Sequence, residues 1–198
     1  MTPLLINTRS ARLSEEQFFM LCADNNELRI ERDKNKNILL MSPTGAFTGR
    51  SHSDIMRQLA NWNYTYKLGE VFDSSSGFTL PNGAIRAPDA AWISRERWAK
   101  VPQHDKERFA HICPDFIIEV RSKSDSLKQQ QEKMEEWMEN GCRLGWLIDL
   151  EHKTTYRYKP GRKVIKQSFI KRMSGENVLP EFELNLKEII IGLTQKLK

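Results

Sequence analysis

A carboxylate and an arginine stand two residues apart in a stretch that otherwise favours a buried strand. Residues 114–122 read PDFIIEVRS, and strand alternation puts Asp115, Glu119 and Arg121 on one face. A lone carboxylate beside large apolar side chains is costly without a cation or strong hydrogen-bond donors. Glu119 therefore requires a partner. One candidate is Arg121, roughly 7 Å further along the same face, and the other is a divalent metal ion.

A metal ion would need a second carboxylate close to Glu119. Asp115 lies about 13 Å away along the same strand, which is too far for ligands that must each reach within about 2.0–2.6 Å of one hard cation. Asp89 stands near the start of another apolar stretch, PDAAWI, at residues 88–93. Because neighbouring strands lie only about 4.8 Å apart, Asp89 and Glu119 on adjacent strands are the favoured pair of ligands.

Periodicity and end signals predict the elements that must position these residues. We expect helices at about residues 14–22, 50–67 and 126–140, the last with Asp125 or Ser126 as its N-cap. We expect strands at 27–32 and 38–41, joined as a hairpin, and at 70–72, 86–93, 115–121, 144–150 and 154–158. The strand, helix and strand between residues 115 and 150 predict a parallel crossover.

Composition limits the class of protein. The 198 residues are enough for one domain, with a core at about 14–190, and show no linker. No apolar run approaches the roughly 20 residues of a membrane helix, and no secretory signal is present, so we expect a cytoplasmic protein. The scattered Cys22, Cys113 and Cys142 predict free thiols, and the net charge of +5 permits binding to phosphate.

Several short motifs, taken in order, carry a resemblance to a known family. The chain resembles the Uma-two family of restriction-endonuclease-like domains, within the PD-(D/E)XK nuclease superfamily. The motifs are MSPTG at 41–45, His52, SSGF at 75–78, LPNG at 80–83, PDAAW at 88–92, PDFIIEVRS at 114–122, KM at 133–134 and NGCRLGWLID at 140–149. The resemblance implies an α/β (α+β) fold with a restriction-endonuclease-like core, in which helices flank a mixed, mostly antiparallel sheet.

The resemblance also implies a catalytic site. Asp89, Glu119 and the backbone carbonyl of Val120 would bind Mg²⁺ or Mn²⁺. The superfamily's lysine, two residues after the glutamate, is replaced here by Arg121, which keeps the charge but cannot give up a proton. In the Uma-two pattern a lysine on the following helix stands in, and that residue is Lys133.

Helical geometry agrees with this role for Lys133. At 100° per residue it lies about 40° beyond the apolar stripe of its helix, where its stem could lie along the core and its amine reach back to the sheet. The alternatives are an ordinary solvated lysine, or Lys123 in the preceding loop as the basic residue.

Two further residues are candidates for the site. Glu31, with Glu27 as a second choice, would bring another acid from the first hairpin. His52 matches the family at the start of the long helix, although a hydrogen bond at the helix start explains it equally well.

The expected function is metal-dependent endonucleolytic hydrolysis of DNA phosphodiester bonds, by a protein that forms a homodimer and has no membrane partner. Candidate contacts to DNA are Arg50, Lys67, Lys123 and Lys128. One alternative is a catalytically inactive nuclease-fold module for nucleic-acid binding or protein interaction, in which Glu119 pairs with Arg121. The other is hydrolysis of RNA or another phosphodiester.

Overall fold

A six-stranded sheet forms the centre of the structure, a computed structural model that describes residues 3–8, 10, 13–169 and 172–189. The strand order is β11-β10-β9-β8-β7-β4. Their bounds are β4 (Gly69–Asp73), β7 (Ala90–Ser94), β8 (Phe116–Arg121), β9 (Leu144–Asp149), β10 (Thr154–Tyr158) and β11 (Ile165–Ser168). Only β8 and β9 run parallel among the strand pairs of this sheet in the described residues. The predicted mixed, mostly antiparallel sheet and its parallel crossover are confirmed.

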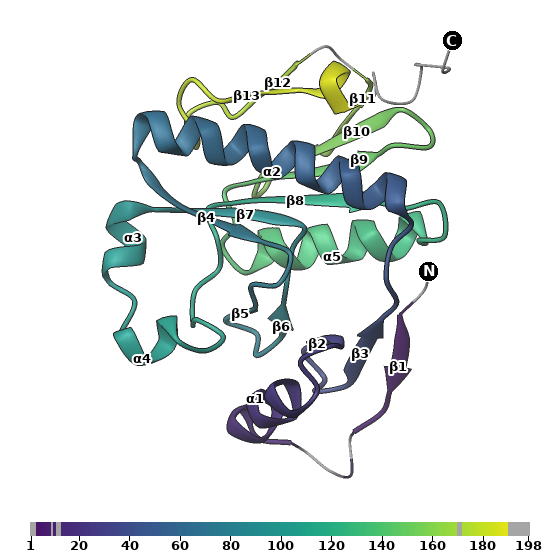
Figure 1. Cartoon of the computed structure of the whole chain (residues 1–198), viewed down its shortest axis with the longest axis vertical. Helices are drawn as coiled ribbons and strands as arrows, with labels where there is room; N and C mark the ends of the chain where they lie inside the picture. The colour runs from purple at the N-terminus through teal and green to yellow at the C-terminus, as the bar shows by residue number, and fades with distance from the viewer. Residues whose placement is uncertain (1–2, 9, 11–12, 170–171, 190–198) are drawn as a thin grey trace.

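Two long helices cover opposite faces of this sheet (Figure 1). Helix α2 (Ala46–Tyr66) packs on the face that carries Phe116, Ile118 and Val120. Helix α5 (Leu127–Glu139) packs on the other face, where Ile117 and Leu147 contact Met134 and Trp137 in a second core. Alternation along β8 therefore decides which helix each of its side chains meets, and it directs the odd-numbered residues toward α5.

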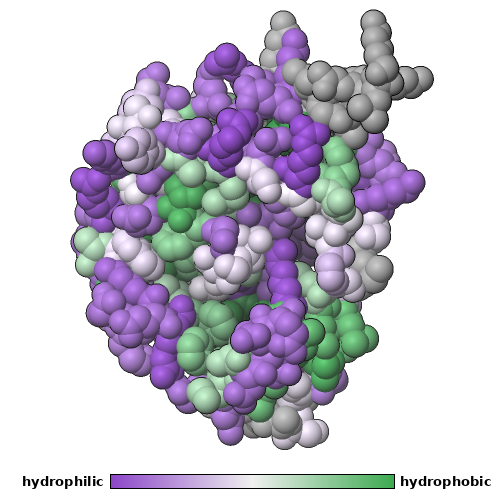
Figure 2. Space-filling view, viewed as in Figure 1, coloured by the Kyte–Doolittle hydropathy of each residue, from purple (hydrophilic) through white to green (hydrophobic). Residues whose placement is uncertain are grey.

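A second sheet, of five short strands, lies beside α5 at the lower part of Figure 1. Its order is β1-β3-β2-β6-β5, and all its pairs are antiparallel. The strands are β1 (Leu4–Ile6), β2 (Arg29–Arg32), β3 (Ile38–Met41), β5 (Phe78–Thr79) and β6 (Ile85–Arg86). Helix α1 (Glu15–Asp24) packs against this sheet through Phe18. The green patch at the lower right of Figure 2 overlies β1, whose Leu4, Leu5 and Ile6 are exposed.

The remaining elements are small. Helices α3 (Arg95–Ala99) and α4 (Gln103–Lys106) follow β7, and β12 (Arg172–Ser174) pairs with β13 (Glu183–Asn185) near α2. Sequence periodicity found neither these four elements nor β1 and β11, because runs of three to five residues are too short to show a period.

The long elements follow the sequence closely. Helix α1 opens with a capping box between Ser14 and Gln17, and Ser126 caps α5 by accepting from the Gln129 N–H. The expected start of α2 at residue 50 was wrong, because the helix begins at Ala46, directly after an extended Gly45.

The three cysteines are free thiols, as predicted. Burial raises the pKa of Cys22 to about 11 and that of Cys113 to about 12. Because the thiolate is the reactive form, these sulfurs are chemically quiet and behave as small core residues. Among the described residues, no helix is both long and apolar enough to cross a membrane.

Gly69, the first residue of β4, packs closely against β7 just after the end of α2. A Cβ at this position would lie 2.1 Å from the Ile93 backbone oxygen and 2.7 Å from the Trp92 ring. We expect Gly69→Ala to lower the free energy of unfolding by about 3 kcal/mol, because a backbone atom cannot yield as a flexible side chain would. Denaturant unfolding followed by circular dichroism measures this change.

Gly49→Ala is the matched control, since it adds the same methyl group inside α2 with no atom nearer than 3.9 Å. We expect it to be neutral or to add up to about 1 kcal/mol, because alanine is the better helix former. Equal losses in the two variants would contradict this account of Gly69.

Candidate active site

The strand register brings Asp89 and Glu119 together. Strands β7 and β8 pair with Ala90 opposite Ile118, so extending this register by one residue brings Asp89, which directly precedes β7, next to Glu119. The Val120 N–H donates to Asp89 Oδ2 at 2.7 Å and holds that carboxylate against β8. Asp89 and Glu119 are both buried, with 8% and 3% of their surfaces exposed.

Lys133 reaches this pair from α5. Its Nζ lies 2.9 Å from Glu119 Oε1 and 2.9 Å from Glu31 Oε1, and it donates to the Ala87 carbonyl oxygen at 3.2 Å. The lysine therefore joins three elements, α5, β8 and β2. The Glu119–Arg121 ion pair expected in the inactive-module alternative is not formed, because Lys133 is the cation that contacts Glu119.

A second set of ion pairs holds Glu31, the partner of Lys133, in place. Glu31 Oε1 accepts from the Ala87 N–H at 3.2 Å, and Glu31 Oε2 contacts Arg86 Nη1 at 3.1 Å. Arg86 Nε donates in turn to Glu136 Oε2 at 2.6 Å, which returns the network to α5. The network couples the small sheet to α5 around a carboxylate, Glu31, that is only 1% exposed.

These contacts give the acids different pKa values. Burial raises the pKa of Glu119 to about 7; the Lys133 amine opposes this rise, and the Asp89 and Glu31 carboxylates add to it. Burial alone would also raise the pKa of Glu31, but Lys133 and Arg86 hold it below its ordinary value. The pKa of Lys133 would fall on burial, yet Glu119 and Glu31 raise it, so the amine stays charged.

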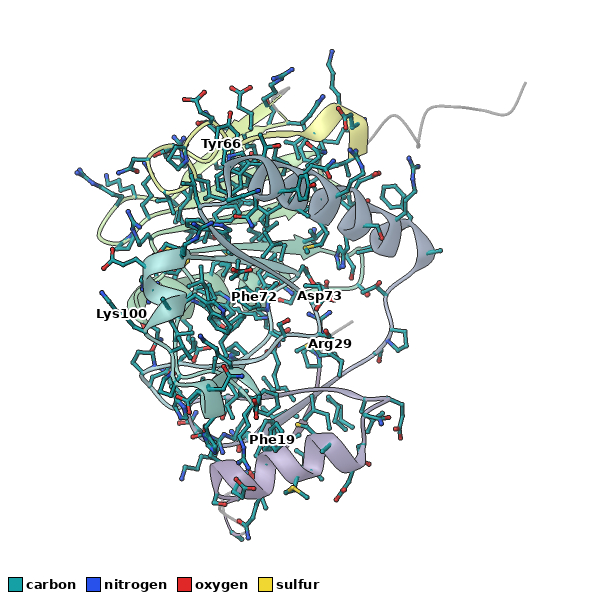
Figure 3. All side chains as sticks on the ribbon, turned by 60° about the vertical axis from the view of Figure 1, so that its left-hand side comes forward. Phe19, Arg29, Tyr66, Phe72, Asp73 and Lys100 are labelled. Carbon is teal, nitrogen blue, oxygen red and sulfur yellow. The ribbon has the colours of Figure 1, made fainter. Side chains whose placement is uncertain are left out.

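His52 and Arg29 stand around Asp89. His52 Nε2 lies 3.6 Å from Asp89 Oδ2, and Arg29 Nη2 lies 3.3 Å from Asp89 Oδ1. Arg29 extends from the small sheet toward the end of β4, where Asp73 lies (Figure 3). His52 Nε2 and Arg29 Nε are buried atoms without a hydrogen-bond partner among the described residues. Polar atoms left in this way beside a carboxylate suit a site that takes up water, an ion or a phosphate group.

Arg121 lies apart from this cluster although it projects from the same face of β8. Its Nη1 contacts Asp149 Oδ2 at 2.7 Å and His152 Nδ1 at 2.9 Å, and its Nε donates to the Asp125 carbonyl oxygen at 3.0 Å. Arg121 thus ties the end of β9 to the loop before α5. The other basic candidate, Lys123, is exposed in that loop, and its Nζ lies 3.9 Å from Glu151 Oε1.

The carboxylates open into a cleft of about 970 Å³. Its walls are the β2–β3 hairpin, the start of α2, the loop at residues 122–126 and one side of α5. Nine carboxylates and five lysine or arginine side chains line it. Those acids are Glu31, Asp33, Asp89, Glu119, Asp125, Glu132, Glu135, Glu136 and Glu139, and the bases are Arg29, Lys34, Arg86, Lys123 and Lys133.

The donor atoms suit a hard divalent cation with few protein ligands. Within the described ranges, no group of three or more His, Cys, Asp or Glu side chains is arranged to chelate a metal. Mg²⁺ commonly binds one or two carboxylates and retains several waters, and Asp89 and Glu119 provide two. The raised pKa of Glu119 also favours a bound cation, because a nearby positive charge would offset the cost of ionising this buried carboxylate.

The structure places the sequence candidates in two groups. Asp89, Glu119, Lys133, Glu31 and His52 come together, and the backbone of Val120 lies among them through its bond to Asp89. Arg121 belongs to the neighbouring Asp149 cluster. The sequence did not identify Arg29, Arg86 or Glu136 as site residues. The one available signal was that Arg29 and Glu31, two residues apart on one strand, share a face.

Comparison with known proteins identifies the family and a similar fold. A family model described as "Putative restriction endonuclease", Uma2, matches residues 15–187. A crystal structure of a putative nuclease belonging to DUF820 from Anabaena variabilis is similar, with a TM-score of 0.70, 18% identity and coverage of 84% of this chain and 92% of that one. The curated proteins give no match.

Fold and site together define a protein of the restriction-endonuclease-like class, with a mixed sheet between helices and paired acids on adjacent strands. More narrowly, the chain belongs to the Uma2 family.

The raised pKa of Glu119 predicts a pH-dependent difference in stability. Between pH 4.5, its ordinary value, and about 7, the folded protein holds the Glu119 proton more tightly than the unfolded chain does. The free energy of unfolding therefore falls as pH rises through this window and levels off above it. Glutamine does not ionise, so we expect the Tm of Glu119→Gln, minus that of the wild type, to grow by several degrees from pH 5 to 7.5 in EDTA.

Asp73→Asn is the control for this titration, because hydrogen bonds from Ser75 lower the pKa of Asp73 although partial burial opposes them. The contribution of the ionised Asp73 to stability is complete above about pH 4 and is lost only at lower pH. We expect the Tm difference between Asp73→Asn and the wild type to stay constant from pH 5 to 7.5. A constant difference for Glu119→Gln as well would contradict the raised pKa of Glu119.

The Arg121–Asp149 pair predicts a large stability effect. Asp149 is 1% exposed, so Arg121→Ala leaves a buried carboxylate without its main cation. We expect the free energy of unfolding to fall by about 3 kcal/mol, as for other broken buried pairs. Arg172→Ala breaks an exposed pair with Glu183 and should cost less than about 1 kcal/mol. Similar losses in the two variants, measured by urea denaturation, would show that Arg121 is not a structural anchor.

Proposed function

We propose that this protein is a metal-dependent endonuclease that hydrolyses phosphodiester bonds of DNA. The observation that carries the proposal is the convergence of Asp89, directly before β7, Glu119 on β8 and Lys133 on α5 in the lining of one cleft. Membership of the Uma2 family supports it independently.

Asp89, Glu119 and the Val120 carbonyl are the proposed ligands of Mg²⁺ or Mn²⁺. When bound, such an ion polarises the scissile phosphate and makes a coordinated water more acidic. The hydrogen bond from the Val120 N–H fixes one oxygen of Asp89 at 2.7 Å, so this carboxylate requires little further ordering. Trp137 Nε1 donates to Glu119 Oε1 at 3.1 Å and orients the second carboxylate from α5.

Lys133 is the proposed cationic catalytic residue. Its contact with Glu31 keeps the amine charged and close to Glu119. A charged amine in a site that excludes water stabilises negative charge that develops on a phosphate oxygen in the transition state. Because Glu31 sustains both the charge and the place of Lys133, we propose Glu31 as a positioning residue.

His52 and Arg121 have more distant proposed roles. His52 Nε2, which is buried beside Asp89, is suited to a hydrogen bond with the attacking water or a phosphate oxygen. Arg121 holds the loop before α5 through the Asp125 carbonyl, so its proposed role is to position this wall of the cleft and to add positive charge beside it.

A symmetric homodimer in the cytoplasm is part of the proposal, because two sites related by a twofold axis could each cut one strand of a duplex.

A catalytically inactive module that binds nucleic acid or protein is the second candidate. The specific observation in its favour is the 2.9 Å contact between Lys133 and Glu119, which supplies Glu119 with a cation in the absence of any metal. Dependence on divalent metal separates the two candidates, because such an ion pair requires none.

The test is cleavage of supercoiled plasmid, single-stranded DNA and RNA with Mg²⁺, Mn²⁺ or EDTA. We expect DNA cleavage that requires metal and falls at least about 100-fold in Asp89→Asn, Glu119→Gln and Lys133→Met. Lys100→Met, at an exposed lysine near α3, is the matched control and should retain full activity.

Cleavage of RNA alone would reassign the substrate. No cleavage of any substrate, together with calorimetry that shows no divalent binding dependent on Glu119, would overturn the proposal in favour of the inactive module.

A further inference from the structure

One segment of the chain has an unusual charge. Between Glu151 and Glu176 the sequence holds 24 residues with eight lysines or arginines and no aspartate or glutamate. The whole chain contains 31 basic and 26 acidic residues, so this segment alone exceeds the net charge of +5. Six of the eight basic residues lie in β10, β11 and the turns beside them, which we call the basic hairpin (residues 153–168).

The active-site cleft has the opposite balance, with nine carboxylates against five lysines and arginines. A polyanionic strand that enters such a cleft gains little attraction from its walls, even when a divalent ion is bound. Tight binding of a nucleic acid depends on cations at its phosphates, so these cations must come from elsewhere on the surface.

Several basic side chains of the hairpin are exposed and are not paired with an acid among the described residues. Arg157 and Lys159 are both engaged by Glu176. By contrast Lys153, Arg162 and Lys163 are exposed, and none has a carboxylate partner within the described residues.

Lys166 has an aromatic partner in place of a carboxylate. Its Nζ lies 5.8 Å from the centroid of the Tyr156 ring, and a cation held over a ring in this way keeps its charge. Lysine on an edge strand such as β11 also discourages pairing with other chains. That explanation does not extend to Lys153, Arg162 and Lys163, which lie in turns outside the strand ladder.

The sheet register places the basic hairpin level with the catalytic acids. Lys166 pairs with Tyr156, Tyr156 with Leu147, and Leu147 with Glu119, so one row crosses four strands. All four side chains belong to the α5 face of the sheet. Three strand spacings separate Lys166 from Glu119, or about 14 Å, which equals about four base-pair steps of duplex DNA.

Charge and register together carry the inference. We propose that the basic hairpin binds the phosphate backbone of the nucleic acid whose scissile segment enters the cleft on the other side of α5. That the ligand of the basic hairpin is a nucleic acid rests on the proposed function. In this arrangement the hairpin supplies affinity without sequence reading, and the cleft supplies the chemistry.

The test compares two double variants of the full-length chain with equal change in charge. Lys163→Glu/Lys166→Glu alters the basic hairpin, and Lys100→Glu/Lys106→Glu alters the α3–α4 region. The pairs match, because Lys106 lies over the Trp98 ring as Lys166 lies over Tyr156, and Lys100 is exposed like Lys163.

Binding of a fluorescent 20-mer duplex and of the corresponding single strand is measured by anisotropy in EDTA, so that cleavage plays no part. We expect the hairpin variant to weaken binding at least tenfold at 100 mM salt and to reduce the log–log salt slope by about 1 to 2. The control should weaken binding less than threefold. Equal effects in the two variants, or none in the hairpin variant, would overturn the inference.

Two further arms separate this inference from the proposed function. Metal-dependent hydrolysis of bis(p-nitrophenyl) phosphate, which is too short to reach the hairpin, should be the same in the hairpin variant and the wild type. If the wild type binds DNA through the hairpin yet cleaves nothing, the nuclease proposal fails, and the hairpin stands as a phosphate-binding surface without cleavage in the cleft. Displacement of the labelled DNA by poly-glutamate at equal charge concentration would overturn it by assigning the hairpin to acidic protein partners.

Discussion

The carboxylate of Glu119, buried at 3% exposure on the α5 face of β8, is the constraint on which the rest of the site depends. A carboxylate in this environment demands a cation. Lys133 meets that demand from α5, and Glu31 keeps Lys133 charged although the amine is itself buried. Because these residues belong to β8, α5 and β2, satisfying one buried charge fixes how the small sheet, the central sheet and the helix are arranged.

This arrangement gives the acids different pKa values. Glu31 faces two cations and remains ionised, whereas Glu119 shares one cation and has other carboxylates nearby. A site built in this way is poised to gain positive charge near Glu119, by a proton or by a metal ion. The same feature makes the site costly for folding, which is expected where function and stability compete.

Charge is also divided over the surface of the molecule. The cleft is acidic, and the basic hairpin three strands away carries much of the positive excess. The same face of the central sheet carries both, with α5 between them. In the proposed function, such a separation lets one region attract a polyanion through simple Coulomb forces, while the other keeps the geometry that bond cleavage requires.

The sequence by itself determined the long elements and singled out Asp89 and Glu119 as the candidate acids. Helices α1, α2 and α5 show in their periodicity and caps, and the hairpin, β8 and β9 show in their alternation. Strand geometry alone excluded Asp115 as a partner of Glu119 and favoured Asp89, which the register then placed opposite it. These features are local, or depend on spacings along a single strand.

Tertiary structure decided which cation meets which acid. Arg121 stands two residues from Glu119 along the strand, yet it pairs with Asp149, which lies directly beside it on parallel β9. The sequence did not predict that Arg29, Arg86 and Glu136 belong to the site, because their partners lie 50 to 60 residues away along the chain. Long side chains choose among several opposite charges within reach, and only the packing of sheets and helix determines which of them is nearest.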